Sequence, residues 1–314
     1  MHKSTITCDG QDLVVDKTGQ DIVFVTDKRG NSMQLQMFEG ILYGTVYRRA
    51  VLQQIKHFQL REDDIYLSAY LRTGTHWTFE MVGMLLNGTA ETIPKFKGKN
   101  QLEFMTNDEL SSLPSPRIIN THFKLSRAPT QLREKKCKII YNLRDPKDVA
   151  ISLYWAYMDG GLSGYQGTFT DFLELFCKGT VDSNGMFENL RDAETFFEEN
   201  PDIQVHFQVY EETIKDPAAQ VRALSDFLGL ERNHELCCAI AEKCTFARMK
   251  ADKDKYSVKV NGKNFFYRKG IVGDWRNWFT EEMLEEYYRV YEEKMAGSRF
   301  YERYARKKID NTTS

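Results

Sequence analysis

The sequence lacks several features that would assign it to large classes of protein. No apolar run approaches the roughly 18 to 20 residues that a membrane-spanning helix needs, and residues 1–5 lead into no secretory signal. The 43 lysines and arginines nearly balance the 45 aspartates and glutamates, and a net charge of −2 gives no general attraction for nucleic acid. We therefore expect a cytoplasmic protein with neither membrane nor nucleic-acid partners, in which any anionic ligand is bound by local groups.

Metal-binding and disulfide patterns are absent as well. The six cysteines are scattered without a CxxC pair, and the six histidines form neither an HExxH motif nor a pair at metal-ligand spacing. Reduced thiols and no protein-held metal are the expectation. Because no internal repeat or low-complexity linker interrupts the 314 residues, a single continuous domain is favoured.

Strand and helix patterns alternate from residue 65 onward. We expect strands at 65–70, 117–120, 138–143 and 203–209, and helices at 75–86, 146–158, 218–228 and 281–295. The helix at 146 is well marked, because Asp145 can cap it while Pro146 occupies the first helical position. This alternation predicts an α/β fold with a central parallel sheet flanked by helices, and a ligand at the carboxyl ends of the strands. The first 40 residues contain two β-prone segments, 21–25 and 33–37, which predict a hairpin-like prelude or a lid on the substrate side.

The first candidate site is the turn YLRTGTHW, from Tyr70 to Trp77, between a strand and a helix. Gly74 lets the backbone approach a ligand closely, the amides from Thr73 onward can donate to an anion, and Arg72 adds a permanent charge. An ordinary capped turn is the alternative. The turn lacks the GxxxxGK[ST] pattern of a Walker A loop, which argues against a conventional ATPase or kinase.

The second candidate combines Arg144, at a strand end, with Ser152, about two turns into the following helix. A guanidinium and a hydroxyl placed in this way could converge on a phosphate. Alternatively, Arg144 pairs with Asp148 and Ser152 bonds back to its own helix.

The third candidate is the segment FYRKG, in which Arg268 and Lys269 precede Gly270, followed by the GDW triplet at 273–275. Adjacent cations beside a glycine can close over an anion. A solvated basic turn is the alternative.

Together these segments resemble the cytosolic sulfotransferases, which transfer a sulfuryl group from 3′-phosphoadenosine 5′-phosphosulfate (PAPS) to a hydroxyl or amine. The resemblance runs from about residue 65 to residue 297. The family patterns YPKxGTxW and RKGxxGDW are matched by 70–77 and 268–275, its Tyr-Glu pair by 210–211, its Thr-His dipeptide by 121–122, and its 3′-phosphate Arg and Ser by Arg144 and Ser152.

The resemblance implies a sulfotransferase domain over 41–300, an acceptor-side prelude over 1–40, a tail over 301–314 and a P-loop-like phosphosulfate-binding loop. It implies His122 as the catalytic base, helped by Arg72, with no metal. The residues implied to bind PAPS, or its product 3′-phosphoadenosine 5′-phosphate (PAP), are Arg72, Thr73, Gly74, Thr75, His76, Trp77, Arg144, Ser152, Tyr210, Cys244, Thr245, Phe246, Arg268, Lys269 and Gly270.

The expected acceptor is a small molecule, such as a phenol, a steroid, another alcohol or an amine. The acceptor pocket is expected to include Phe38, Tyr43, Phe123, Tyr154, Tyr157 and Met158, although each of these could equally be a core residue. Three glycines in 160–164 predict a mobile loop beside this pocket.

The chain departs from the family pattern at several positions. Leu71-Arg72 replaces Pro-Lys, Asn120 replaces the lysine before Thr-His, and Cys244 replaces a threonine. The family's dimer segment is matched by 276–285 with Glu281 in place of a valine, so a homodimer stays an open expectation. The loss of the two lysines leaves a PAPS-binding homologue with weak or no catalysis as the alternative function, and a P-loop nucleotide kinase as a more distant one.

Overall fold

The structure is a computed structural model that describes residues 6–8, 11–12, 19–159, 163–260 and 262–306. A four-stranded parallel sheet in the order β7-β6-β8-β9 lies at its centre. All four predicted strands are present, and the predicted α/β fold with a parallel sheet is confirmed. They are β6 (Ile65–Ser68), β7 (Ile118–Thr121), β8 (Lys138–Leu143) and β9 (Val205–Val209).

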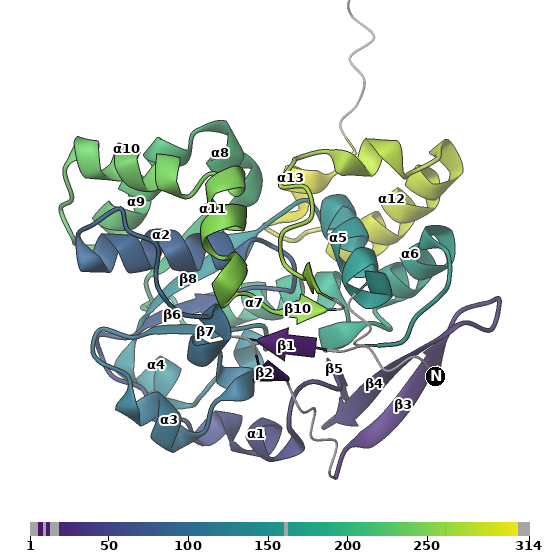
Figure 1. Cartoon of the computed structure of the whole chain (residues 1–314). Coiled ribbons are helices and arrows are strands. Elements are labelled where there is room, and N and C mark those ends of the chain that lie inside the picture. Colours follow the sequence, from purple (N-terminus) through teal and green to yellow (C-terminus); the bar gives the residue numbers. More distant parts are fainter. Residues whose placement is uncertain (1–5, 9–10, 13–18, 160–162, 261, 307–314) are drawn as a thin grey trace, which may run out of the picture.

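Helices cover both faces of this sheet, which is why its strands are apolar on both sides. Along β6, Ile65 and Leu67 pack against α2 (Thr75–Asn87), α9 (Pro217–Leu228) and α10 (His234–Lys243), whereas Tyr66 belongs to the core on the opposite face. That second core includes residues of α5 (Pro146–Asp159), α6 (Phe169–Lys178), α7 (Met186–Glu199) and α12 (Glu281–Met295). Figure 1 shows the green helices α9 and α10 beside α2, and the yellow helix α12 beside α5 and α6.

The N-terminal segment forms an antiparallel sheet of β3 (Asp21–Thr26), β4 (Ser32–Phe38) and β5 (Ile41–Gly44), so the expected hairpin is confirmed. This sheet extends across residue 40. It is tied to the turn η5 (Asp182–Asn184), because the Gly44 amide donates to Asp182 Oδ2 at 2.8 Å. A further small sheet joins β1 (Ile6–Cys8) and β2 (Gln11–Asp12) to β10 (Lys259–Val260) and β11 (Lys263–Asn264).

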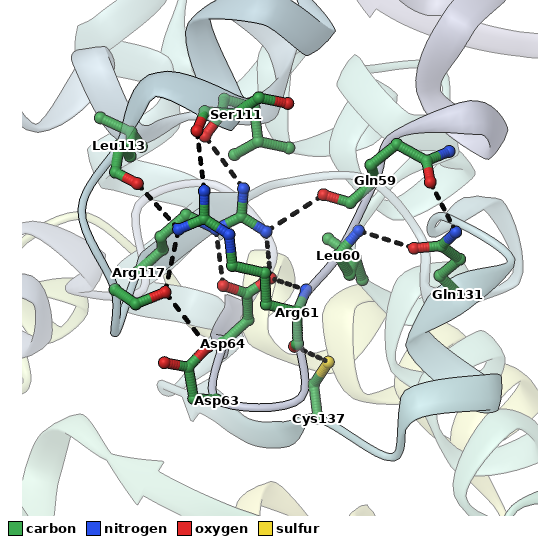
Figure 2. Close-up of polar contacts among 12 residues, drawn as sticks. Gln59, Leu60, Arg61, Asp63, Asp64, Ser111, Leu113, Arg117, Gln131 and Cys137 are labelled. Carbon is green, nitrogen blue, oxygen red and sulfur yellow. Dashed lines mark hydrogen bonds and ion pairs between the residues drawn. The ribbon is translucent and has the colours of Figure 1, made fainter.

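A buried ion pair fixes the end of the central sheet where β6 and β7 begin. Arg117 donates from Nε to Asp64 Oδ1 at 2.7 Å and from Nη2 to Asp64 Oδ2 at 2.5 Å. Its Nη1 group donates to the Leu110 carbonyl, and Arg61 spans nearby carbonyls of the same region (Figure 2). Because both charges are paired and hydrogen-bonded, this cluster holds the strand starts in register.

Shorter elements connect these layers. The helical ones are α1 (Arg49–Gln54), η1 (Ile55–His57), η2 (Lys97–Asn100), η3 (Leu102–Phe104), α3 (Asn107–Ser112), η4 (Leu125–Arg127), α4 (Gln131–Lys135), α8 (Tyr210–Lys215), α11 (Phe246–Asp252), η6 (Asp254–Tyr256), η7 (Asp274–Asn277) and α13 (Tyr301–Tyr304). The expected mobile loop includes 160–162, and the expected tail includes 307–314; both segments lie outside the described residues. None of the helices in the described part of the chain combines the length and apolar character needed to span a bilayer.

Candidate active site

The carboxyl ends of the four parallel strands meet at a cavity of about 1040 Å³. The loop after β6, His122 after β7, Arg144 after β8 and Tyr210 after β9 all line it. Every residue that the sequence nominated for catalysis or cofactor binding lines this cavity except Thr73. Residues separated by almost 200 positions in the chain are thus brought together around one space.

The loop after β6 is shaped for close approach of a ligand to its backbone. Gly74 has φ of +99°, and a Cβ at this position would lie 2.9 Å from Tyr210 Cδ2. Arg72 has φ of +66°, a left-handed conformation that is uncommon for a residue with a side chain and concentrates at functional sites. The first backbone hydrogen bonds of α2 are donated by Trp77 and Thr78 to the Gly74 carbonyl, so the preceding amides are left for a ligand.

Thr73 supports this loop from inside. Its hydroxyl donates to the Tyr70 carbonyl at 2.8 Å, and only 1% of the residue is exposed. The side chain is therefore directed away from the cavity, and any contact of Thr73 with a ligand would involve its backbone amide.

Hydrogen bonds link the side chains of Arg72 and Arg144 to the loop and to α5. Arg72 Nε donates to Ser152 Oγ at 3.0 Å, and Arg144 Nη1 donates to the Arg72 carbonyl at 3.0 Å. The Arg144 guanidinium lies 4.2 Å from the Tyr210 ring centroid, and its Nε is buried and has no hydrogen-bond partner among the residues that the structure describes. Burial lowers the pKa of Arg72 to about 10, and the charges of Arg144 and Arg268 add to that shift. Three guanidinium groups therefore converge on one region.

The sequence left an Arg144–Asp148 ion pair open as an alternative. Asp148 instead accepts hydrogen bonds from the backbone amides of Gly273 (2.7 Å) and Trp275 (3.0 Å). These bonds fasten the GDW turn to α5. Because Glu211 Oε1 accepts from the Asp145 amide at 2.8 Å, the ends of β8 and β9 are fastened to each other in the same way.

Arg268 and Lys269 share one carboxylate. Arg268 Nη2 and Lys269 Nζ donate to the two oxygens of Asp274 at 2.7 and 2.8 Å. Burial alone would raise the pKa of Asp274, but the hydrogen bonds from Lys269 and Arg268 lower it to about 2. A Cβ on Gly270 would lie 2.2 Å from the Phe246 ring, so this backbone is pressed against an aromatic wall.

The aromatic wall continues on both sides of the loop. The Trp77 ring lies 5.6 Å from Tyr210, and Phe246 lies 6.1 Å from Tyr267. Such faces can stack on a planar base. Cys244 also lines the cavity, but only 1% of it is exposed and its sulfur contacts Met84 Sδ at 3.9 Å, whereas the neighbouring Thr245 is exposed.

His122 lies at the junction between the cationic region and the rest of the cavity. Its Nδ1 is 3.0 Å from the Ala69 carbonyl, which can only accept, so Nδ1 carries the proton and the lone pair is on Nε2, for which the described residues supply no hydrogen-bond donor. Burial lowers the pKa of His122 to about 3, and the charges of Lys97 and Arg72 contribute to this shift, whereas the Ala69 hydrogen bond opposes it. The imidazole is therefore neutral at physiological pH.

Two buried charged residues that contact residues lining the cavity were not anticipated from the sequence. Glu103 in η3 accepts hydrogen bonds from the Thr121 hydroxyl at 3.0 Å and from the His122 amide, and burial raises its pKa to about 6. Lys97 in η2 donates from Nζ to Thr75 Oγ1 at 3.0 Å. In the sequence, both appear as ordinary charged residues, and only the fold shows that they are buried.

Most of the residues expected around an acceptor belong to the core instead. Tyr157 lines the cavity, together with Tyr47, Phe104 and Asp182. The remaining expected side chains are buried in the core or pack against it, because each fills space between the sheets and helices: Phe38, Tyr43, Phe123, Tyr154 and Met158.

Comparison with known proteins decides the family. A family profile described as "Sulfotransferase domain" matches residues 62–299. The chain belongs to the sulfotransferase family. It is an enzyme that depends on PAPS as the sulfuryl donor, as the resemblance implied.

Individual sulfotransferases are similar to the chain over most of its length. Sulfotransferase 1B1 of Mus musculus is 31% identical over 282 residues, which cover 84% of this chain and 93% of that protein. Amine sulfotransferase of Oryctolagus cuniculus is 29% identical over 265 residues, which cover 80% of this chain and 87% of that protein. The crystal structure of mouse sulfotransferase SULT7A1 complexed with PAP superposes with a TM-score of 0.75 and covers 86% of this chain and 98% of that chain. The two sequences are 30% identical.

Proposed function

We propose that this sulfotransferase acts on the hydroxyl or amine of a small molecule, with His122 as the general base and without a metal. The observation that carries the proposal is the lone pair of His122 Nε2 beside a cavity whose other side gathers three guanidinium groups. A base and a set of cations are the two components that proton removal and a charged leaving group require.

The residues at the strand ends fit a nucleotide with phosphates at both ends. Arg144, with its unpartnered buried Nε, together with Ser152, Arg268, Lys269 and the Gly270 amide would hold the 3′-phosphate. The remaining groups would hold the adenine and the 5′-phosphosulfate. The base would lie among Trp77, Tyr210 and Phe246, while the phosphosulfate would lie on the backbone of the loop Arg72, Thr73, Gly74, Thr75 and His76.

Arg72 and the loop amides are the groups that would neutralise charge on the leaving side. PAPS supplies an activated sulfuryl group with PAP as its leaving group. Arg72 lies between Ser152 and the Phe266 carbonyl, and its planar fork can donate to more than one phosphate oxygen. Because these donors are already oriented by the fold, little reorganisation is needed as charge develops.

His122 would accept the proton of the acceptor. Its orientation is set from two sides, by the Ala69 carbonyl at Nδ1 and by Glu103 at the backbone amide. In the protein without a bound donor, the low pKa of His122 keeps its imidazole unprotonated. An anionic donor near Arg72 would offset the positive charges and move the pKa of His122 upward, which would make it a stronger base.

The cavity beyond His122 supports a hydroxyl or amine acceptor with a flat apolar body. Tyr47, Phe104 and Tyr157 provide aromatic walls. Asp182 also faces this space, and burial raises its pKa to about 7. A carboxyl group in an aromatic pocket can bind an amine or a hydroxyl, so phenols, steroids, other alcohols and amines are the classes to screen.

An acceptor screen with labelled PAPS, run in the presence of a metal chelator, tests this proposal. We expect sulfated product from at least one phenol, steroid or amine, and chelation should not reduce the rate. The competing reading is a PAPS-binding protein without turnover, which would gain thermal stability with PAP yet release no product. A homodimer and a cytoplasmic location stay predictions, which size-exclusion chromatography and localisation in cells would test.

A further inference from the structure

A lysine is buried directly behind the phosphosulfate loop. Lys97 is 2% exposed, and its Nζ donates to Thr75 Oγ1 at 3.0 Å. Within the described parts of the chain, Lys97 forms no ion pair and makes this one side-chain hydrogen bond. An ammonium group carries three N–H donors, so two of them are left without a protein acceptor.

Lys253 shows how the same fold satisfies a buried lysine that has only a structural role. Its Nζ lies 2.7 Å from Glu80 Oε1 and donates to the carbonyls of Ile93 at 2.7 Å and Lys95 at 2.9 Å. All three donors are used and the charge is paired. Within the described parts of the chain, no carboxylate lies at ion-pair distance from Lys97, so an anion bound at the loop would stabilise the charged form of this lysine.

The surroundings of Lys97 are rich in positive or ionisable groups. Arg72, His76 and His122 all interact electrostatically with Lys97, and Glu103 is the carboxylate that faces it without a hydrogen bond. Burial lowers the pKa of Lys97 to about 7; Glu103 opposes this shift and Arg72 adds to it. The Glu103 oxygen Oε1 is engaged by Thr121 and by the His122 amide, whereas Oε2 is buried and has no hydrogen-bond partner among the described residues, so Glu103 acts on Lys97 through its charge alone.

We infer that Lys97 is a positioning residue for the phosphosulfate end of the donor, where it orients the Thr75 hydroxyl and adds a positive charge. Since Thr75 Oγ1 accepts from Lys97, the hydroxyl proton is free to donate into the cavity that Thr75 lines. The inference rests on the proposed function, because it requires an anionic donor at this loop. Lys97 also places an ammonium group near this loop, in which Arg72 replaces the lysine of the family pattern.

A proton should then bind together with the donor. An anion favours the charged form of Lys97, so its pKa rises above 7 in the complex. A group whose pKa is raised by a ligand takes up a proton on binding when the pH lies between its free and bound pKa values. As the pH rises through this range, the affinity for the ligand falls by up to about tenfold per pH unit. At pH 8 the free amine is about one-tenth protonated, so an anion that raises the pKa of Lys97 by about two units or more causes it to take up roughly 0.8 to 0.9 proton.

The two histidines near the loop and the phosphate of PAP contribute little at that pH. The pKa of His122 is about 3 and that of His76 lies well below 6.5, so both would stay largely neutral at pH 8 even after a substantial upward shift. The second ionisation of a phosphate monoester has a pKa of about 6, so PAP is already charged. Asp182 and Glu103, whose pKa values are about 7 and about 6, can also take up protons when an anion binds, so the contribution of Lys97 is the difference in uptake between the wild-type protein and a Lys97 variant.

Calorimetric titration with PAP at pH 8, in two buffers of different ionisation enthalpy, measures the proton uptake directly. We expect Lys97→Met to take up roughly 0.8 to 0.9 proton less than the wild-type protein, and its affinity at pH 7 should fall roughly 10- to 100-fold. Lys97→Arg, which stays charged at all accessible pH values, should regain affinity with the same reduced proton uptake. Arg117→Met is the control: it removes a buried cation at the opposite end of the sheet and should lower Tm while the uptake is unchanged.

The outcomes separate this inference from the proposed function. An uptake in Lys97→Met equal to that of the wild-type protein, or in Lys97→Arg should the methionine variant not fold, would overturn the assignment while PAP binding still supports the function. A wild-type protein that does not bind PAP at all would overturn the proposed function, and the inference with it.

Discussion

Replacement of Arg144 by methionine should remove selectivity for the 3′-phosphate. The Arg144 guanidinium lines the cavity over the Tyr210 ring, holds the loop through one bond to the Arg72 carbonyl and keeps Nε free. One or two charge-assisted hydrogen bonds to a phosphate would be lost, which corresponds to about 2–4 kcal/mol, or roughly 30- to 1000-fold in the Kd of PAP.

The comparison ligand is adenosine 5′-phosphosulfate, which lacks the 3′-phosphate. Because Arg144 would not contact it, we expect its Kd to change less than about threefold, the remaining effect arising from the lost bond to Arg72. Calorimetry or competition binding of both nucleotides to the wild-type protein, Arg144→Met and Arg144→Lys gives the two ratios. Because Arg144→Lys keeps the positive charge, its Kd for PAP should lie between those of the wild-type protein and Arg144→Met. Equal losses for both nucleotides would refute the assignment, because they would mean that Arg144 acts only by holding the loop.

Three further outcomes are expected. His122→Ala should lower kcat by roughly 10²- to 10⁴-fold with little change in PAP affinity, and steady-state rates near those of the wild-type protein would exclude the residue as the base. Arg72→Lys should keep or raise the sulfuryl-transfer rate, because a compact ammonium can donate to one bridging oxygen; a collapse of the rate would show that the arginine fork is required. Arg117→Met leaves Asp64 as an unpaired buried charge and should cost about 3–5 kcal/mol in chemical denaturation, with PAP affinity of the folded protein unchanged.

The sequence contains strong local signals for the parts of the site that follow strands. The apolar run at 138–143 ends at Arg144, and Pro146 begins the next helix, as the structure shows. The predicted cap is present too, because Asp145 Oδ1 accepts from the Lys147 amide at 2.9 Å. Such features depend on residues within a few positions of one another, which a single sequence displays directly.

The segment that carries Lys97 and Glu103 could not be placed in the same way. It contains only short 3-10 turns, η2 and η3, without a periodic pattern. Its position depends on distant anchors, since Lys253 binds the carbonyls of Ile93 and Lys95 from about 160 positions away in the chain. The acceptor residues were difficult for a related reason: an aromatic side chain has the same sequence signal whether it lines a cavity or fills the core.

The distribution of buried charge explains why the site lies where it does. At the strand starts, Arg117 is matched by Asp64 with two hydrogen bonds, which favours a rigid structure. At the strand ends, Arg72, Arg144 and Lys97 form no ion pair with any carboxylate in the described parts of the chain, and burial and mutual repulsion lower the pKa of Arg72. Like charges held together in this way cost folding free energy before a ligand binds. An anionic donor removes that repulsion, so the same arrangement that weakens the free protein orients the cations in advance for binding and for charge development on the leaving group.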